Sequence, residues 1–171
     1  RYWRDGVQTC ALPIFHVGYS ESTWLPARDG TDHGDVKRSV KSPNNSFFEK
    51  WTSMDGSITW WVDVMKDADY EVTLRYTCSK GNEGAVIQLA CEPDVDSSVA
   101  AAGAGTVGMI ASTSAAVNQA YDPPLYDKSL ERVEQSHYFV KDFRAMSLGN
   151  LHLGEGTWIL RLSALEIPGA E

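Results

Sequence analysis

The sequence predicts an all-β protein, an antiparallel jelly roll or β-sandwich, and three observations support this prediction. Residues 57–78 alternate apolar and polar side chains with a period of two, which is typical of strands that bury one face. Along the chain, about seven to nine short strand-like segments are separated by turns roughly every 8–12 residues, the spacing of sandwiches and jelly rolls. A chain of 171 residues suffices for a single domain with one core.

The first residues are set aside from the fold prediction. Gly6–Ile14, GVQTCALPI, is the translation of a DNA string that matches a widely used sequencing-library adapter. We therefore expect residues 1–14 to be a translation artefact on a metagenomic gene fragment, comparable to a fusion scar; the alternative is a genuine N-terminal loop. Residues 15–171 then form a single β-sandwich domain, which we expect to be truncated at both ends relative to a parent protein.

Loops and short extended pieces precede the central strands. Phe15–Ala27 contains an extended segment. Residues 28–34 are a turn-rich loop, because the glycines of its Asp-Gly and His-Gly pairs adopt positive φ without strain. Val36–Ser39 is a candidate short strand. Phe47–Trp51 carries three aromatic residues in five, and we expect this segment to close one end of the core.

The central strands give the clearest pattern. One face of the first strand is apolar and should be buried, namely Ile58, Trp60, Val62 and Val64, whereas Trp61 belongs to the opposite face. One face of the second strand is also apolar, namely Tyr70, Val72, Leu74, Tyr76 and Cys78. A polar turn at residues 66–69 joins the two strands, and we therefore predict an antiparallel hairpin.

Strands become regular again toward the end of the chain. Ala85–Cys91 is a third strand, Thr106–Val117 contains one or two weak strands, and Leu125–Gln135 is a long loop with one helical turn. Met146–Leu153 and Thr157–Ile167 are two further strands joined by a Gly-Glu-Gly turn, which predicts a second hairpin. In the last strand, one face is apolar and consists of Trp158, Leu160 and Leu162.

Cysteine spacing favours free thiols. If the strands that end at Cys78 and begin at Ala85 form a simple hairpin, Cys91 lies opposite Thr73 and not opposite Cys78. A disulfide needs Cα atoms within about 7 Å. We therefore predict two free, buried thiols.

One loop carries a concentration of acidic residues. Asp29, Asp32, His33 and Asp35 lie within seven residues, and a hard cation such as calcium takes several oxygen ligands. The spacing fits no EF-hand, and a solvated acidic turn is the commoner use of such a loop. We expect no metal, and Asp29 and Asp32 are the candidate ligands if a cation does bind.

Charge and motifs exclude several classes of function. The formal net charge of −8 disfavours nucleic acid and anionic membranes as partners, because both favour clustered Lys and Arg. No apolar stretch approaches the roughly 20 residues of a membrane span. The chain contains no Gly-x-Ser-x-Gly, phosphate loop or dinucleotide fingerprint, so we predict no catalytic residue and no cofactor in this fragment.

Aromatic residues in and beside loops supply the candidate binding site. Aromatic rings on a β-sandwich can stack on sugar rings, which combine an apolar face with a polar rim. A carbohydrate site built in this way would use Trp51, Asp122 and Tyr126. The alternative role of such aromatics is packing, either within the domain or against a neighbouring one.

From about Thr23 to Gly169, the sequence resembles the C-terminal accessory region of some bacterial formylglycine-dependent sulfatases, usually described as arylsulfatases or N-acetylgalactosamine-6-sulfatases. The matching segments, in order, are LPARDGTDHG (25–34), VKRS (36–39), SPNNSFFEKWTS (42–53), ITWWVDV (58–64), DYEVTLRYTC (69–78), YDPPLY (121–126), VKDFRAMSLGNLHL (140–153) and LSALEIPG (162–169). The strands also look like galactose-binding-like sandwiches and carbohydrate-binding modules. Family members tend to carry Asp at the position of Trp61, and residues 94–118 are longer here.

The resemblance implies an enzyme for the parent gene, a sulfuric ester hydrolase, and a non-catalytic domain for these residues. Calcium and formylglycine would belong to the upstream catalytic domain, which this sequence lacks. The implied partners are that catalytic domain and a sulfated glycan, and the implied location is periplasmic or secreted. We expect an accessory domain that packs on the catalytic domain and binds glycan; the alternatives are a stand-alone carbohydrate-binding module and a purely structural docking domain.

Overall fold

A computed structural model describes residues 14–39, 47–93, 111–124 and 141–168. The strands in these residues are β1 (Ile14–Val17), β2 (Thr31–His33), β3 (Lys37–Arg38), β4 (Phe48–Glu49), β5 (Ser57–Val64), β6 (Ala68–Tyr76), β7 (Val86–Pro93), β8 (Ala111–Ala116), β9 (Arg144–Leu153) and β10 (Gly156–Glu166). A 3-10 turn, η1 (Ala27–Asp29), lies between β1 and β2. The predicted all-β class is therefore confirmed for the described part of the chain.

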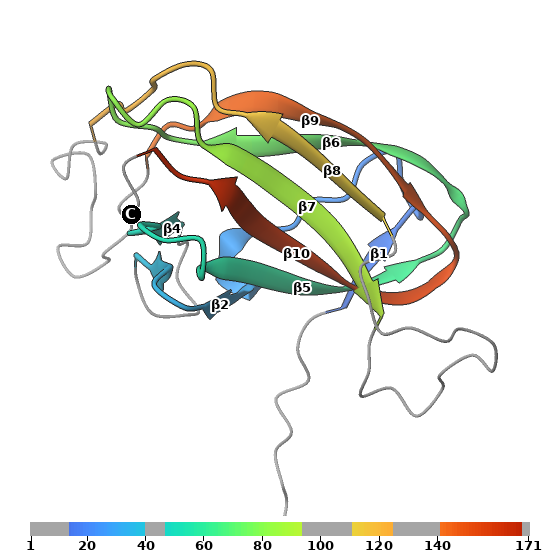
Figure 1. The fold of residues 1–171 in the computed structure, drawn as a ribbon. Coiled ribbons are helices and arrows are strands. Elements are labelled where there is room, and N and C mark those ends of the chain that lie inside the picture. Colours follow the sequence, from blue (N-terminus) through green and yellow to red (C-terminus); the bar gives the residue numbers. More distant parts are fainter. Residues whose placement is uncertain (1–13, 40–46, 94–110, 125–140, 169–171) are drawn as a thin grey trace, which may run out of the picture.

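The strands form layers that enclose one core. The larger sheet has the order β1-β5-β10-β7-β8, with β2 also paired to β5, and the smaller sheet consists of β6 and β9 (Figure 1). A third, minor sheet pairs β3 with β4. The fully buried side chains come from both layers, among them Val62 and Val64 of β5 and Leu151 of β9. Within the described residues, no helix is long and apolar enough to span a membrane.

The sheets differ from the prediction in which strands pair. β5 and β6 do not form a hairpin: Trp60 of β5 lies opposite Leu160 of β10, and Tyr70 of β6 lies opposite Leu151 of β9. The polar turn after Val64 carries the chain from the larger sheet to the smaller one. β9 and β10 are likewise in different sheets, so the second predicted hairpin is also wrong. The predicted buried faces are correct because all these strands bury one face in the same core.

β1 is the exception to the antiparallel arrangement. It pairs in parallel with β5, and Ile14 lies opposite Trp61. A parallel pair needs a long crossover connection, which the loops between Val17 and Ser57 provide. Ile14, expected to belong to an artefact, thus begins the first strand, whereas residues 1–13 lie outside the described residues.

A β-bulge in β9 changes which side chains face the core. Val72 of β6 lies opposite Gly149, and Thr73 lies opposite Ser147, so Leu148 has no counterpart on β6. Gly149 has a φ of 100°, the left-handed conformation that glycine adopts at such bulges. The bulge shifts the alternation by one residue, and Leu148 and Leu151 are therefore both buried.

The cysteine prediction is partly wrong. Cys91 lies opposite Leu160 and not opposite Thr73, because β7 pairs with β10 and β8. Cys78 and Cys91 are both free, as predicted, but only Cys91 is fully buried. Burial raises the pKa of the Cys91 thiol to about 11, and nearby Glu92 adds to the shift. Cys78 is half-buried, and burial raises the pKa of its thiol as well.

The aromatic segment around β4 closes one end of the core, as predicted. Phe48 and Trp51 pack against the buried cluster. The ring of Phe47 contacts the ring of Phe143, just before β9, with centroids 5.6 Å apart. The predicted loop at residues 125–135 lies outside the described residues.

Candidate functional site

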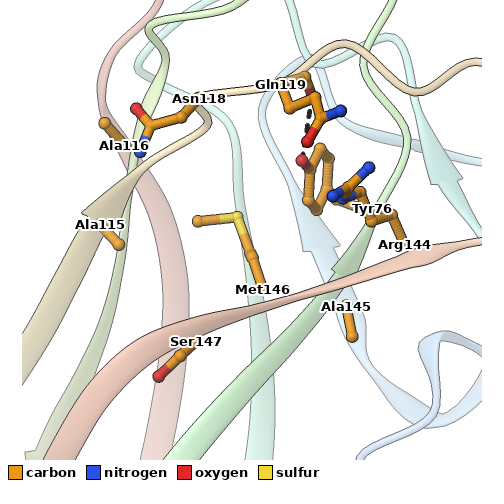
Figure 2. Close-up of a pocket in the computed structure, with 9 residues that line it drawn as sticks. All are labelled: Tyr76, Ala115, Ala116, Asn118, Gln119, Arg144, Ala145, Met146 and Ser147. Carbon is orange, nitrogen blue, oxygen red and sulfur yellow. Dashed lines mark hydrogen bonds between the residues drawn. The ribbon is translucent and has the colours of Figure 1, made fainter.

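A pocket opens where β8 and β9 separate from each other. At Thr113, the two strands are close enough for the hydroxyl of Thr113 to donate to the carbonyl oxygen of Leu148. Toward the end of β8 and the start of β9 they diverge, and a pocket of about 280 Å³ lies between them (Figure 2). Its lining residues are Tyr76, Ala115, Ala116, Asn118, Gln119, Arg144, Ala145, Met146 and Ser147.

One wall of the pocket is a short crossing segment after β8. The N–H of Val117 donates to the carbonyl of Ala85 at 2.8 Å, on the side of the larger sheet. Four residues later, Tyr121 pairs with Cys78 through two 2.8 Å backbone hydrogen bonds, on the side of the smaller sheet. Asn118 and Gln119 lie on the stretch between these two anchors and are exposed.

The opposite wall is the end of the β6–β9 ladder where β6 ends and β9 begins. Tyr76 and Arg144 lie directly opposite each other in the ladder, so both side chains leave the sheet on the same face. The hydroxyl of Tyr76 donates to the carbonyl oxygen of Gln119 at 3.0 Å, which fixes the crossing segment to β6 (Figure 2). Met146, two residues after Arg144, supplies an apolar surface beside them.

Ion pairs and hydrogen bonds hold the chain that follows the crossing segment. The carboxylate of Asp122 accepts hydrogen bonds from the Lys141 ammonium and from the Ser79 hydroxyl, the latter at 2.6 Å. These two hydrogen bonds, the one from Lys141 foremost, lower the pKa of Asp122 below its usual value. The hydroxyl of Tyr121 donates to Asp142 at 2.6 Å. The segments before β9 and after β8 are thereby tied together beside the pocket.

The described lining of the pocket combines hydrogen-bond donors with apolar surface. The lining residues in the described part of the chain include no carboxylate, histidine or thiol. The lining offers a guanidinium and two primary amides, all of which donate hydrogen bonds. Tyr76 and Met146 add apolar surface. Such a mixture of apolar surface and a few polar groups is typical of small-molecule sites.

The residues predicted as a carbohydrate site do not line this pocket. Trp51 lies between β4 and β5, and its indole Nε1 is buried beside Gly56 without a hydrogen-bond partner in the described residues. Asp122 lies next to the crossing segment but is engaged by Lys141 and Ser79. Tyr126 lies outside the described residues. Their role in binding sugar stays a prediction.

The candidate metal ligands lie apart and face cationic side chains. Asp29 pairs with its neighbour Arg28 at 3.3 Å, and Asp32 lies 3.9 Å from Arg38. Asp35 instead accepts two 2.7 Å hydrogen bonds from the backbone and hydroxyl of Thr52. Across the described ranges, no three acidic, histidine or cysteine side chains gather as a cation would need.

Arg144 is the pocket residue that the sequence could have indicated. It shares its alternation phase with Met146 and Leu148, the apolar positions at the start of β9. A charged residue at a position that alternation assigns to the inner face is a signal of a functional role. The signal was missed because the predicted strand began only at Met146. Asn118 and Gln119 carry no comparable signal, because polar residues after a strand are ordinary loop residues.

Comparison with protein-family models, with curated proteins and with solved structures found no match. The pocket and the sequence resemblance are therefore the two lines of support for the function proposed next.

Proposed function

We propose that this chain is a non-catalytic, carbohydrate-binding β-sandwich domain of the galactose-binding-like, jelly-roll type, and the accessory domain of a sulfatase that acts on sulfated polysaccharide. The observation that carries the binding role is the pocket between β8 and β9, with its donor groups beside an aromatic ring. The sequence resemblance supports the sulfatase context. In that context the domain packs on the catalytic domain and keeps the polysaccharide near it, which raises the local substrate concentration.

The lining suits a sugar in both polarity and size. Hydroxyl groups of a sugar accept hydrogen bonds from the amides of Asn118 and Gln119, while its apolar face packs on Tyr76 or Met146. A volume of about 280 Å³ lies just below the usual range of ligand pockets, so the pocket suits one sugar residue rather than a long chain.

Calorimetric titration of the whole chain with neutral and sulfated oligosaccharides tests the proposal. We expect binding, and we expect the double variant N118A/Q119A to weaken it about 30-fold, because two neutral hydrogen bonds contribute about 1 kcal/mol each. Asn150→Ala is the matched control: Asn150 is an exposed asparagine of β9 opposite Glu71 and does not line the pocket. Affinity that is equal in all three proteins would refute the pocket as the binding site.

A docking role is the second candidate, and one observation favours it. On the outer face of the larger sheet, Ile14, Trp61 and Ile159 lie side by side on three neighbouring strands. Ile14 is 53% exposed, and the other two are partly exposed. Such an apolar row is typical of a contact surface. In titrations with glycan, Trp61→Ser leaves the affinity unchanged if this row serves docking alone.

A further inference from the structure

We infer that the pocket between β8 and β9 recognises an anionic substituent of a sugar, a sulfate ester or a carboxylate, through Arg144. This inference rests on the proposed carbohydrate binding and names the class of carbohydrate. It depends on the charges that line the pocket, on the surroundings of Arg144 and on the other hydrogen-bond donors of the lining.

Arg144 differs from the other arginines of the described residues in having no partner among those residues. Arg28 pairs with Asp29, and Arg161 binds Glu92 at 2.8 Å. Arg38 donates to two backbone carbonyls and lies over the Phe48 ring, and Arg75 lies over the Trp24 ring at 5.0 Å. In a chain with a net charge of −8, a guanidinium without a carboxylate partner among the described residues is notable.

Two acidic side chains in the segments beside the pocket are already engaged. Asp142, two residues before Arg144, accepts the hydroxyl of Tyr121, and Asp122 accepts Lys141. Among the described residues, the lining of the pocket contains no carboxylate. The positive charge of Arg144 is therefore not compensated by the groups that line the pocket.

The donors around Arg144 complement an anion with several oxygens. A guanidinium presents N–H groups in a planar fork that matches the oxygens of a sulfate or a carboxylate. The amides of Asn118 and Gln119 add neutral donors from the crossing segment after β8. Tyr76 lies directly opposite Arg144 in the ladder and gives the sugar ring an apolar surface next to the charge.

Binding measurements with three oligosaccharides of one backbone, neutral, sulfated and carboxylated, test the inference in the whole chain. We expect the two anionic sugars to bind more tightly than the neutral one. Arg144→Gln should weaken anionic binding by about 10- to 100-fold, the range for a hydrogen bond to a charged group, and change neutral binding by less than about twofold. The two anionic sugars show whether sulfate or carboxylate is preferred.

Arg75→Gln is the matched control. This substitution removes the same charge from β6, at a residue that does not line the pocket. Arg144 is exposed and has no partner in the described residues, so its variant should unfold at the same temperature as the parent. A preference for anionic sugars that Arg144→Gln retains in full, or equal affinity of the unmodified chain for neutral and anionic sugars, would overturn the inference while leaving carbohydrate binding in place. Absence of binding to all three sugars by the unmodified chain would overturn the proposed function itself.

Discussion

Gly56, the residue before β5, lies where three packed groups leave no space for a side chain. A Cβ at this position would meet the carboxylate of Asp35 and the Val36 methyl, and would lie 2.9 Å from the indole Nε1 of Trp51. Gly56→Ala should therefore lower the free energy of unfolding by about 1–3 kcal/mol, the usual cost of overpacking. Denaturant unfolding measures this change.

Gly154→Ala serves as the control for that substitution. The nearest atom to a Cβ at Gly154 is a carboxylate oxygen of Asp67 at 3.7 Å, which is an ordinary contact. We expect the denaturant concentration at the unfolding midpoint of Gly154→Ala to stay close to that of the parent. If Gly56→Ala is as stable as Gly154→Ala, the packing described around Trp51 is wrong.

Asp35 makes the stability of the domain depend on pH in the acidic range. The hydroxyl of Thr52, followed by backbone donors of Thr52 and Ser53, holds the pKa of Asp35 below its usual 3.8. Because folding lowers this pKa, the carboxylate stabilises the fold above pH 3.8, and the contribution is lost as the pH falls through the folded pKa. Thermal unfolding of Asp35→Asn should show a shallower loss of stability over that acidic range than the parent. Parallel pH profiles for the two proteins would contradict this role.

At the scale of the elements, one side-chain hydrogen bond joins β8 to β9. The hydroxyl of Thr113 donates to the Leu148 carbonyl, which the bulge leaves without a counterpart on β6. Thr113→Val keeps the shape of the side chain and removes this hydrogen bond, so it should destabilise the domain by about 1 kcal/mol. Thr113→Ser, which retains the hydroxyl, should lie nearer the parent in chemical denaturation. A valine variant as stable as the serine variant would mean that the contact does not join the two strands energetically.

The sequence predicts the faces of the strands better than their partners. Alternation identifies Ile58 and Trp60 as buried because the period of two depends only on which face meets the core. It contains no information about which strand lies alongside, and a short polar turn is compatible with a hairpin or with a crossing between sheets. The bulge at Gly149 was equally hidden, because a glycine within a strand pattern has several uses.

The candidate site depends on those unpredicted pairings. The pocket exists because β8 and β9, which belong to different sheets, are close at Thr113 and diverge beyond it. Tyr76 was predicted to face inward, and it does lie half-buried on that face. Its neighbour Arg144 could be recognised only through the β6–β9 register, which places the two residues opposite each other.

At the scale of the whole molecule, the rates at which a thiol reagent modifies the cysteines measure whether the core is closed. Cys91 is buried in the core, and its thiol, with a pKa of about 11, is protonated near neutral pH. We expect a thiol reagent to modify Cys91 only when the domain unfolds, and Cys78 to react in the folded protein more slowly than a free cysteine. The measurement uses Cys10→Ser, because Cys10 lies outside the described residues. Rapid labelling of Cys91 in the folded protein would contradict a closed core. The variant Cys91→Ala shows which part of the labelling signal comes from Cys91.

The central position of β10 has a consequence for how the protein is made. β10 lies between β5 and β7 in the larger sheet, yet it is the last of the described strands to be synthesised. While the chain emerges from the ribosome, the facing edges of β5 and β7 therefore have no strand to pair with. Unpaired edges of this kind promote aggregation, and pairings between distant segments form slowly. A nascent chain stalled before residue 156 would hold these edges open, and that is the stage at which chaperones would matter most.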